Sequence, residues 1–418
     1  MEDKKDLVRG SLIGGAVGDA LGYTVEFDRY AEIIAKYGHP GITRYELRGG
    51  VAEISDDTQM TLFTANGMLM GMTRWYMRGI GAAPEYYTDV AYKDWYHTQT
   101  KTYDDVMIQS KKPHHHRFTW ISAIPVLYAR RAPGNTCLTA INDILNGRTP
   151  KNDSKGCGGV MRVAPYGLFC GCREVGYSIE EIDVAGGEIA RLTHKHPLGW
   201  MPAILLTHIL YRLVKDTPLN VLDKASARKA FGDVVREALQ LLPQLKVKNN
   251  VHEVTWDKEK PLGEVFPKAI ERQRELVKQA LALADNSQSD IENIRQRGEG
   301  WVGEEALAIA VYAVARHIDS FEETIIAAVN HDGDSDSTGS VAGNIMGAIV
   351  GYEAIPQHFK DHLELRDIIL AIADDLHQGC IISEYNTDDT PEKRQWYERY
   401  CRMEPAGIID IFMNEAAT

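Results

Sequence analysis

Two acidic clusters hold the side chains best suited to chemistry. One is the run Ser55-Asp56-Asp57-Thr58, and the other is the run Asp332-Gly333-Asp334-Ser335-Asp336-Ser337-Thr338. Both set carboxylates beside hydroxyls, and such hard oxygen ligands suit Mg²⁺, Mn²⁺ or Ca²⁺. Like charges held close together cannot all stay ionised without a cation. A fold that brought the two clusters together would therefore imply bound divalent metal.

A calcium-binding loop does not explain the second cluster. Asp332, Asp334 and Asp336 fit the first, third and fifth positions of such a loop. Its sixth position should be glycine and is Ser337, and its twelfth should be glutamate and is Gly343. Helix capping by one residue of each cluster remains an alternative. Joined, the clusters instead suit a two-metal site that binds substrate hydroxyls and activates water.

The segment Ser154-Lys155-Gly156-Cys157-Gly158-Gly159-Val160-Met161-Arg162 is a candidate anion-binding loop. Its glycines let backbone N–H groups approach an anion, and Lys155 and Arg162 add positive charge. The spacing matches neither a Walker loop nor the GxGxxG fingerprint. A flexible turn explains the glycines equally well, and the flanking cations favour phosphate binding.

Two further residues are candidates whose roles the spacing leaves open. Glu26 follows the first glycine-rich segment, where it could act on a water or be a surface acid. His194 lies in Thr193-His194-Lys195-His196-Pro197, at the end of a predicted helix. No third ligand lies at zinc spacing, so a helix cap or a ligand hydrogen bond fits His194 better than zinc does.

The elements that must position these residues are helices. Apolar residues recur at three- and four-residue spacing, and alternating β-branched runs are nearly absent. We therefore predict an all-α fold, an orthogonal multi-helix bundle. Helices are expected over 60–80, 121–131, 157–172, 182–193, 202–215, 225–245, 263–285, 304–316, 321–330, 339–352 and 363–378.

Two predicted helices, one of them at the start of the chain, each carry a stripe of glycines. Their members, spaced by four, are Gly10, Gly14, Gly18 and Gly22 in one helix and Gly339, Gly343, Gly347 and Gly351 in the other. A glycine inside a helix costs about 0.5–1 kcal/mol relative to alanine, and close helix packing can offset that cost. Membrane helix pairs share such stripes, but the apolar stretch after Gly339 is too short to span a bilayer. We predict a central helix pair that positions the acidic clusters, which would form a dinuclear metal site.

Composition narrows the class of protein. The chain has 418 residues, 44% of them hydrophobic, and a formal net charge of −13. Such an acidic chain argues against nucleic acid as its main partner. The six cysteines form no CxxC pair and suit a reducing compartment. The start of the chain is charged and no long apolar stretch follows, so we expect a cytoplasmic protein without membrane association.

The domain organisation is expected to be simple. Residues 1–380 should form one helical domain, in which the segment 73–120, rich in Tyr, Trp and His, is a peripheral elaboration. Residues 381–418 are mixed and polar, and they should form a C-terminal extension or cap.

Several motifs occur together in a fixed order. They are Gly18-Asp19-Ala20-Leu21-Gly22, Ser55-Asp56-Asp57-Thr58, the Gly156 loop ending in Met161-Arg162, Thr193-His194, Gly300-Trp301-Val302-Gly303-Glu304-Glu305-Ala306-Leu307 and Gly333-Asp334-Ser335-Asp336-Ser337-Thr338-Gly339. Over residues 8–378 the chain resembles the ADP-ribosylglycohydrolase family, which includes the dinitrogenase-reductase-activating glycohydrolases and the arginine ADP-ribosylhydrolases. The resemblance implies an all-α bundle around two Mg²⁺ ions, with Mn²⁺ as the alternative.

The resemblance also implies roles for the matching positions. Ser55, Asp56 and Asp57 would bind one metal, and Asp334, Asp336 and Ser337 would bind the other, with Asp336 bridging. The implied substrate-binding residues are Lys155, Gly156, Gly158, Gly159, His194 and Trp301, with the glycines on the diphosphate. The catalytic candidates are Glu26, Asp57 and Asp334, any of which could take the proton of a water. Asp332 is expected not to bind a metal directly, and to be either a bystander or a residue of the metal's outer shell.

The implied activity is Mg²⁺-dependent hydrolysis of the N-glycosidic bond of ADP-ribosyl-arginine on proteins, which releases ADP-ribose. One alternative is hydrolysis of O-linked ADP-ribose on serine, or of a free ADP-ribosyl metabolite. Another is an immunity or binding protein that neutralises an ADP-ribosyltransferase toxin by occluding the toxin or its target. The intact acidic set argues against a purely structural relative, since a scaffold has no need to hold like charges together.

Overall fold

The computed structural model describes residues 2–110, 118–216, 219–247, 260–385 and 388–401, and the chain is helical over most of this length. Within these ranges, strand is limited to β1 (Lys246–Val247) and β2 (Lys260–Pro261), which pair antiparallel. The predicted all-α fold is therefore confirmed.

The first half of the chain contains α1 to α9 and three short 3₁₀ turns. They are α1 (Glu2–Tyr23), α2 (Tyr30–Tyr37), α3 (Asp56–Arg78), α4 (Pro84–Thr100), α5 (Tyr103–Ser110), η1 (Trp120–Ala123), η2 (Pro125–Tyr128), α6 (Asn135–Leu145), η3 (Cys157–Gly159), α7 (Ala164–Gly171), α8 (Ile179–Arg191) and α9 (Pro197–Lys215). Two 3₁₀ turns stand where we predicted one helix over 121–131, because Pro125 starts a new turn there.

The second half supplies the remaining helices. They are α10 (Lys224–Leu241), η4 (Leu242–Gln244), α11 (Leu262–Val265), α12 (Pro267–Leu283), α13 (Asp290–Arg295), α14 (Gly303–Arg316), α15 (Phe321–Val329), α16 (Ser335–Val350), α17 (Gln357–Lys360), α18 (Arg366–Gln378) and α19 (Pro391–Tyr400).

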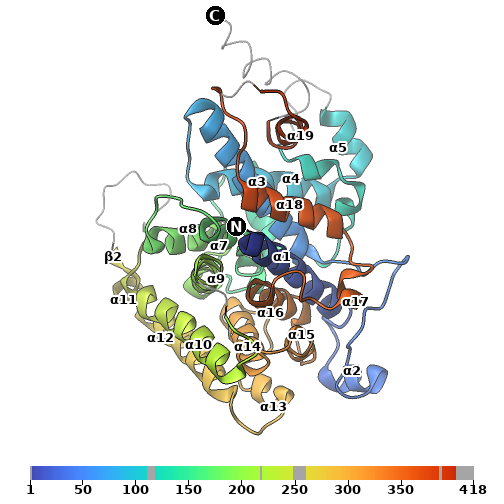
Figure 1. Cartoon of the computed structure of the whole chain (residues 1–418), viewed down its shortest axis with the longest axis vertical. Helices are drawn as coiled ribbons and strands as arrows, with labels where there is room; N and C mark the ends of the chain where they lie inside the picture. The colour runs from blue at the N-terminus through green and yellow to red at the C-terminus, as the bar shows by residue number, and fades with distance from the viewer. Residues whose placement is uncertain (1, 111–117, 217–218, 248–259, 386–387, 402–418) are drawn as a thin grey trace, which may run out of the picture.

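Helices α1 and α16 lie side by side at the centre of the molecule (Figure 1). Their glycines meet in antiparallel order, with Gly18 against Gly339 and Gly14 against Gly343. A methyl group on Gly339 would lie only 2.5 Å from the carbonyl oxygen of Gly18, so the two backbones touch. This contact confirms the predicted central helix pair. Gly351, which we expected inside the second helix, lies just past its end as the C-cap.

Helix α9 lies in the interior beside α7, α8 and α14. By length and composition it could cross a membrane, but 83% of its apolar window is buried within the protein. Helix α9 therefore has the burial of a core helix.

Both segments that we set apart in the sequence contribute buried side chains. In the 73–120 segment, Tyr92 and Trp95 of α4 are fully buried, and α4 packs against α3. In the C-terminal segment, Trp396 of α19 donates a hydrogen bond to Thr73 Oγ1 at 2.9 Å, and Tyr400 donates one to Asp375 Oδ2 at 2.6 Å. Residues 111–117, 386–387 and 402–418 of these segments lie outside the described ranges. The proposed division into domains stays a prediction.

Candidate metal centre and active site

Three carboxylates converge where α1 ends and α16 begins. Glu26 follows α1, Asp334 is the N-cap of α16 and Asp336 lies in its first turn. One carboxylate oxygen from each of the three lies within 4.8 Å of the others, and all three side chains are buried. The arrangement follows from the glycine packing, because α16 starts beside the last turn of α1. Such a set of hard oxygen atoms is suited to a divalent cation.

The first acidic cluster faces the same place from the start of α3. Ser55 is the N-cap of α3 and accepts a hydrogen bond from the Asp57 N–H at 3.2 Å. Asp56 and Asp57 are buried in the first turn, and the Gly134 N–H donates to Asp56 Oδ2 at 3.2 Å. Helix capping by Ser55 therefore leaves the buried carboxylates of Asp56 and Asp57 available as candidate ligands. In the second cluster Asp334 caps α16, because its carboxylate accepts a hydrogen bond from the Ser337 N–H at 3.4 Å.

The electrostatics show that the two clusters meet. Burial, together with the charge of Asp336, raises the pKa of Asp56 and of Asp57 well above the ordinary value. Burial and then the charges of Asp336 and Asp334 raise the pKa of Glu26 to about 10. Raised pKa values mean that the ionised form of these buried, crowded carboxyl groups is disfavoured. A bound cation would stabilise the ionised form.

Two carboxylate oxygens support the same conclusion. Glu26 Oε2 and Asp57 Oδ2 are buried and have no hydrogen-bond partner among the residues that the structure describes. A buried acceptor without a partner costs about 1–3 kcal/mol, so such atoms are normally satisfied. The oxygen donors, their burial and these two free acceptors fit a hard divalent cation.

Asp19 is a site residue whose role the sequence reasoning missed. Fully buried on α1, it accepts hydrogen bonds from the Ser55 N–H at 2.9 Å, the Thr58 N–H at 3.0 Å and the Thr58 hydroxyl. Burial and the charge of Asp336 raise the pKa of Asp19 to about 7. Asp19 thus ties the start of α3 to α1. The signal in the sequence was an acid inside the apolar, glycine-striped helix.

The glycine loop lies against the same region. Gly156 forms an antiparallel bridge with Val302, and the Gly303 N–H donates to the Lys155 carbonyl oxygen at 2.8 Å. The loop itself contains the 3₁₀ turn η3, and the next α-helix begins only at Ala164, later than we predicted. Trp301 is held beside the loop because its carbonyl oxygen accepts from the Cys157 N–H at 3.2 Å.

His194 and Arg162 were both candidates for contact with a ligand, and they lie in different surroundings. His194 is buried beside the loop, where a methyl group on Gly156 would lie 3.1 Å from His194 Nε2. Arg162, which we expected to face an anion, is fully buried instead. Its guanidinium donates to Thr193 Oγ1 at 2.6 Å and lies 4.7 Å from the centroid of the Tyr92 ring. Arg162 therefore serves the core and is not available to a phosphate.

Cys157 links the loop to the acids. Its Sγ donates a hydrogen bond to Asp334 Oδ2 at 2.8 Å. No pattern in the sequence pairs these residues, which lie 177 positions apart in the chain. Asp332 points elsewhere, as we expected: it accepts from the Tyr30 N–H at 2.9 Å and forms an ion pair with Arg295 at 2.8 Å.

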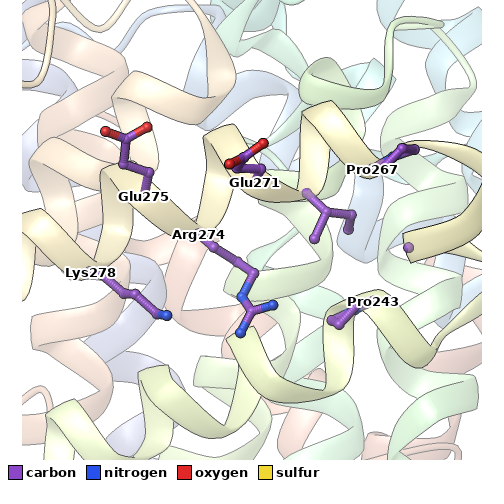
Figure 2. Close-up of a pocket in the computed structure, with 8 residues that line it drawn as sticks. Pro243, Pro267, Glu271, Arg274, Glu275 and Lys278 are labelled. Atoms are coloured by element: carbon purple, nitrogen blue, oxygen red, sulfur yellow. The ribbon is translucent and has the colours of Figure 1, made fainter.

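A groove of about 590 Å³ lies apart from these residues, between α12 and the turn that contains Pro243 (Figure 2). Its lining mixes two prolines with acidic and basic side chains, among them Glu271, Arg274 and Lys278. None of the predicted site residues lines it. With charges of both signs interspersed, the groove does not indicate a class of ligand.

Comparisons with known proteins agree with the geometry. A family model described as ADP-ribosylglycohydrolase matches residues 1–385. The ADP-ribosyl-[dinitrogen reductase] glycohydrolase of Rhodospirillum rubrum is 24% identical over 88% of this chain and 97% of that protein. ADP-ribosylhydrolase ARH1 of Dictyostelium discoideum is 23% identical over 53% of this chain, and the match spans 60% of its own length.

A solved structure, from an ADP-ribosylglycohydrolase-related protein complex, has the same fold. It covers 90% of this chain and 99% of its own with a TM-score of 0.56, at 20% sequence identity. The family model matches far more than half of the chain. The chain therefore belongs to the ADP-ribosylglycohydrolase family, a family of hydrolases that act on ADP-ribose linkages.

Proposed function

We propose that this protein hydrolyses the N-glycosidic bond between ADP-ribose and arginine on modified proteins, in a reaction that depends on Mg²⁺. The observation that carries the proposal is the buried meeting of Glu26, Asp334 and Asp336 with the Asp56-Asp57 pair. The family supports hydrolysis of ADP-ribose linkages. An acidic site favours arginine as the acceptor residue because its guanidinium is cationic, whereas a serine hydroxyl is neutral.

The proposed metal ligands come from both clusters. Ser55, Asp56 and Asp57 would hold one cation, with Asp334 and Asp336 on a second. Ser337 would be the third ligand of the second cation. It lies in the same turn as Asp336, and its N–H donates a hydrogen bond to Asp336 Oδ1 at 2.9 Å. Bound cations would orient ribose hydroxyls and lower the pKa of a water. Mg²⁺ suits the all-oxygen donor set, and Mn²⁺ is the alternative.

The protein's own carboxylates carry the rest of the mechanism. Cleavage of an N-glycoside builds positive charge on the ribose, and the buried carboxylates stabilise that charge. Glu26, Asp57 and Asp334 are the candidates for the general base. Glu26 and Asp57 each keep an unpartnered carboxylate oxygen among the described residues, so each has an acceptor ready for a proton from water.

The glycine loop is the proposed diphosphate site. Gly158 and Gly159 lie in the tight turn η3, and Gly156 precedes it, so their backbone groups can approach a ligand closely. Lys155 supplies a positive charge at the same loop, and His194 borders it. Cys157 connects this loop to Asp334, which would place the diphosphate beside the carboxylates.

The test is release of ADP-ribose from two matched peptides, one modified on arginine and one on serine. We expect release from the arginine peptide with Mg²⁺, and loss of release with EDTA or in the Asp334→Asn variant. The Asp332→Asn variant is the matched control, because its carboxylate points to Arg295 and the Tyr30 N–H. Release from the serine peptide alone would overturn the arginine assignment.

We also propose a cytoplasmic location. The six cysteines are all free, which supports a reducing compartment.

A further inference from the structure

Two exposed aromatic rings stack on each other at the acidic site. Phe27 and Trp301 have ring centroids 6.1 Å apart and planes inclined by 20°. The Phe27 side chain is 74% exposed and that of Trp301 is 39% exposed. Large apolar side chains left open to solvent beside a buried charged cluster are typical of a binding surface.

The chain fixes both rings close to the carboxylates. Phe27 directly follows Glu26, whose carboxylate lies with those of Asp334 and Asp336. On the other side, the Asp334 N–H donates to the Glu299 carbonyl oxygen at 2.8 Å, two residues before Trp301. A methyl group on Gly300 would lie 3.4 Å from Asp334 Cβ, so the residue preceding Trp301 packs beside the acid.

Two arginines near the rings are each neutralised by an ion pair with an acid. Arg29, two residues after Phe27, forms an ion pair with Glu299 at 2.5 Å. Arg295 is paired with Asp332. With these arginines matched by acids, a cation that approaches the rings meets the negative potential of the buried carboxylates behind them.

We propose that Phe27 and Trp301 form an aromatic platform that binds the guanidinium group of the ADP-ribosylated arginine side chain. This inference rests on the proposed arginine specificity and names the part of the site that produces it. A planar guanidinium stacks on aromatic rings and is attracted to their faces by a cation–π interaction. A serine linkage offers neither a charge nor a plane, so the platform selects between the two classes of substrate.

The test compares Phe27→Ala and Trp301→Ala with Trp301→Phe in the full-length, Mg²⁺-loaded protein. We expect each alanine variant to raise KM for the arginine-modified peptide about 3- to 10-fold, the range for an exposed to partly desolvated cation–π contact. Trp301→Phe keeps a ring and should stay within about 2-fold of the parent. The affinity for ADP-ribose, measured by calorimetry, should change less than about 2-fold in all three.

Trp75→Ala is the matched control. Trp75 is a 57% exposed tryptophan that also contacts a neighbouring ring, that of Tyr76 at 5.4 Å. It lies near the C-terminal end of α3, about 28 Å along the helix from the acids at the N-terminal end. Its substitution should leave KM unchanged.

Two results would overturn the platform, and a third would overturn the proposed function. Unchanged KM in both alanine variants rules it out, and thermal unfolding of each alanine variant shows whether a change in KM comes from a loss of folding. A parallel fall in ADP-ribose affinity would assign the rings to the nucleotide instead. If the parent protein fails to cleave the arginine peptide, the proposed function itself is wrong. If the parent cleaves that peptide and the variants match it, only the platform is wrong.

Discussion

The contact between α1 and α16 can be tested by adding one methyl group. Gly343, like Gly347, lies where the backbones of the two helices are in close contact. A Cβ atom there would lie 2.5 Å from the Gly14 carbonyl carbon and 3.0 Å from the Gly15 nitrogen. Carbon atoms pack at about 3.5–4.0 Å, so the Gly343→Ala variant requires the helices to separate by about 1 Å.

Two opposing effects set the magnitude. Alanine improves helix propensity by about 1 kcal/mol. Overpacking of a core typically costs about 1–3 kcal/mol, and the upper end applies here because backbone atoms cannot rotate away. We therefore expect Gly343→Ala to lower the free energy of unfolding by about 2 kcal/mol. Asp334 and Asp336 start the same helix, and metal sites tolerate only about 0.2 Å of error in ligand distances, so Mg²⁺ affinity should fall about tenfold.

The control is the same substitution at Gly232, inside α10. There the atoms nearest to a Cβ atom belong to the guanidinium end of Arg236, the first at 3.1 Å, and that end can swing away. Gly232→Ala should therefore be neutral or stabilising by up to about 1 kcal/mol. Urea unfolding and Mg²⁺ calorimetry would measure both effects. Equal urea midpoints and equal Mg²⁺ affinities for the two variants would refute the argument that the glycine packing positions the acids.

Three further predictions concern buried charge. Asp334→Asn removes one of the crowded carboxylates, so the metal-free protein should unfold at a higher temperature, while the stabilisation by Mg²⁺, about 2.7 kcal/mol at 100 times Kd in the parent, should fall by more than half. An unchanged Mg²⁺ response, checked by thermal unfolding with Asp332→Asn as control, would contradict this. The pKa of Glu26 is raised by burial and neighbouring carboxylates from 4.5 to about 10. Its contribution to the stability of the metal-free protein is therefore full below about pH 4.5 and is lost as the pH rises through 10, and Glu26→Gln should flatten that slope in urea unfolding with EDTA. Arg131 donates to Glu364 Oε1 at 2.9 Å and to the Ile54 carbonyl oxygen at 2.9 Å, so Arg131→Ala should lose about 3–5 kcal/mol by leaving a buried carboxylate unpaired. An Arg131→Met, Glu364→Leu double variant should recover most of that loss, and a double variant no more stable than the single one would argue against the charge explanation.

The sequence by itself determined the class of fold, the helix pair and the acidic residues that are candidate metal ligands. Helical periodicity and the four-residue glycine spacing are local patterns, and each has a direct physical reading in the packing of one helix face. The clusters Ser55-Asp56-Asp57 and Asp334-Asp336 could be recognised because several hard oxygen ligands stand within a few residues. The motif order then indicated the family.

Only the tertiary structure decided which contacts the individual residues of the site make. Asp19 proved to anchor α3, Cys157 to contact Asp334, and Arg162 to serve the core. The pairing of Phe27 with Trp301 likewise joins two distant segments. Each of these contacts depends on how helices and loops from separate parts of the chain pack together. Contacts of this kind connect residues far apart in the chain, and no local spacing records them.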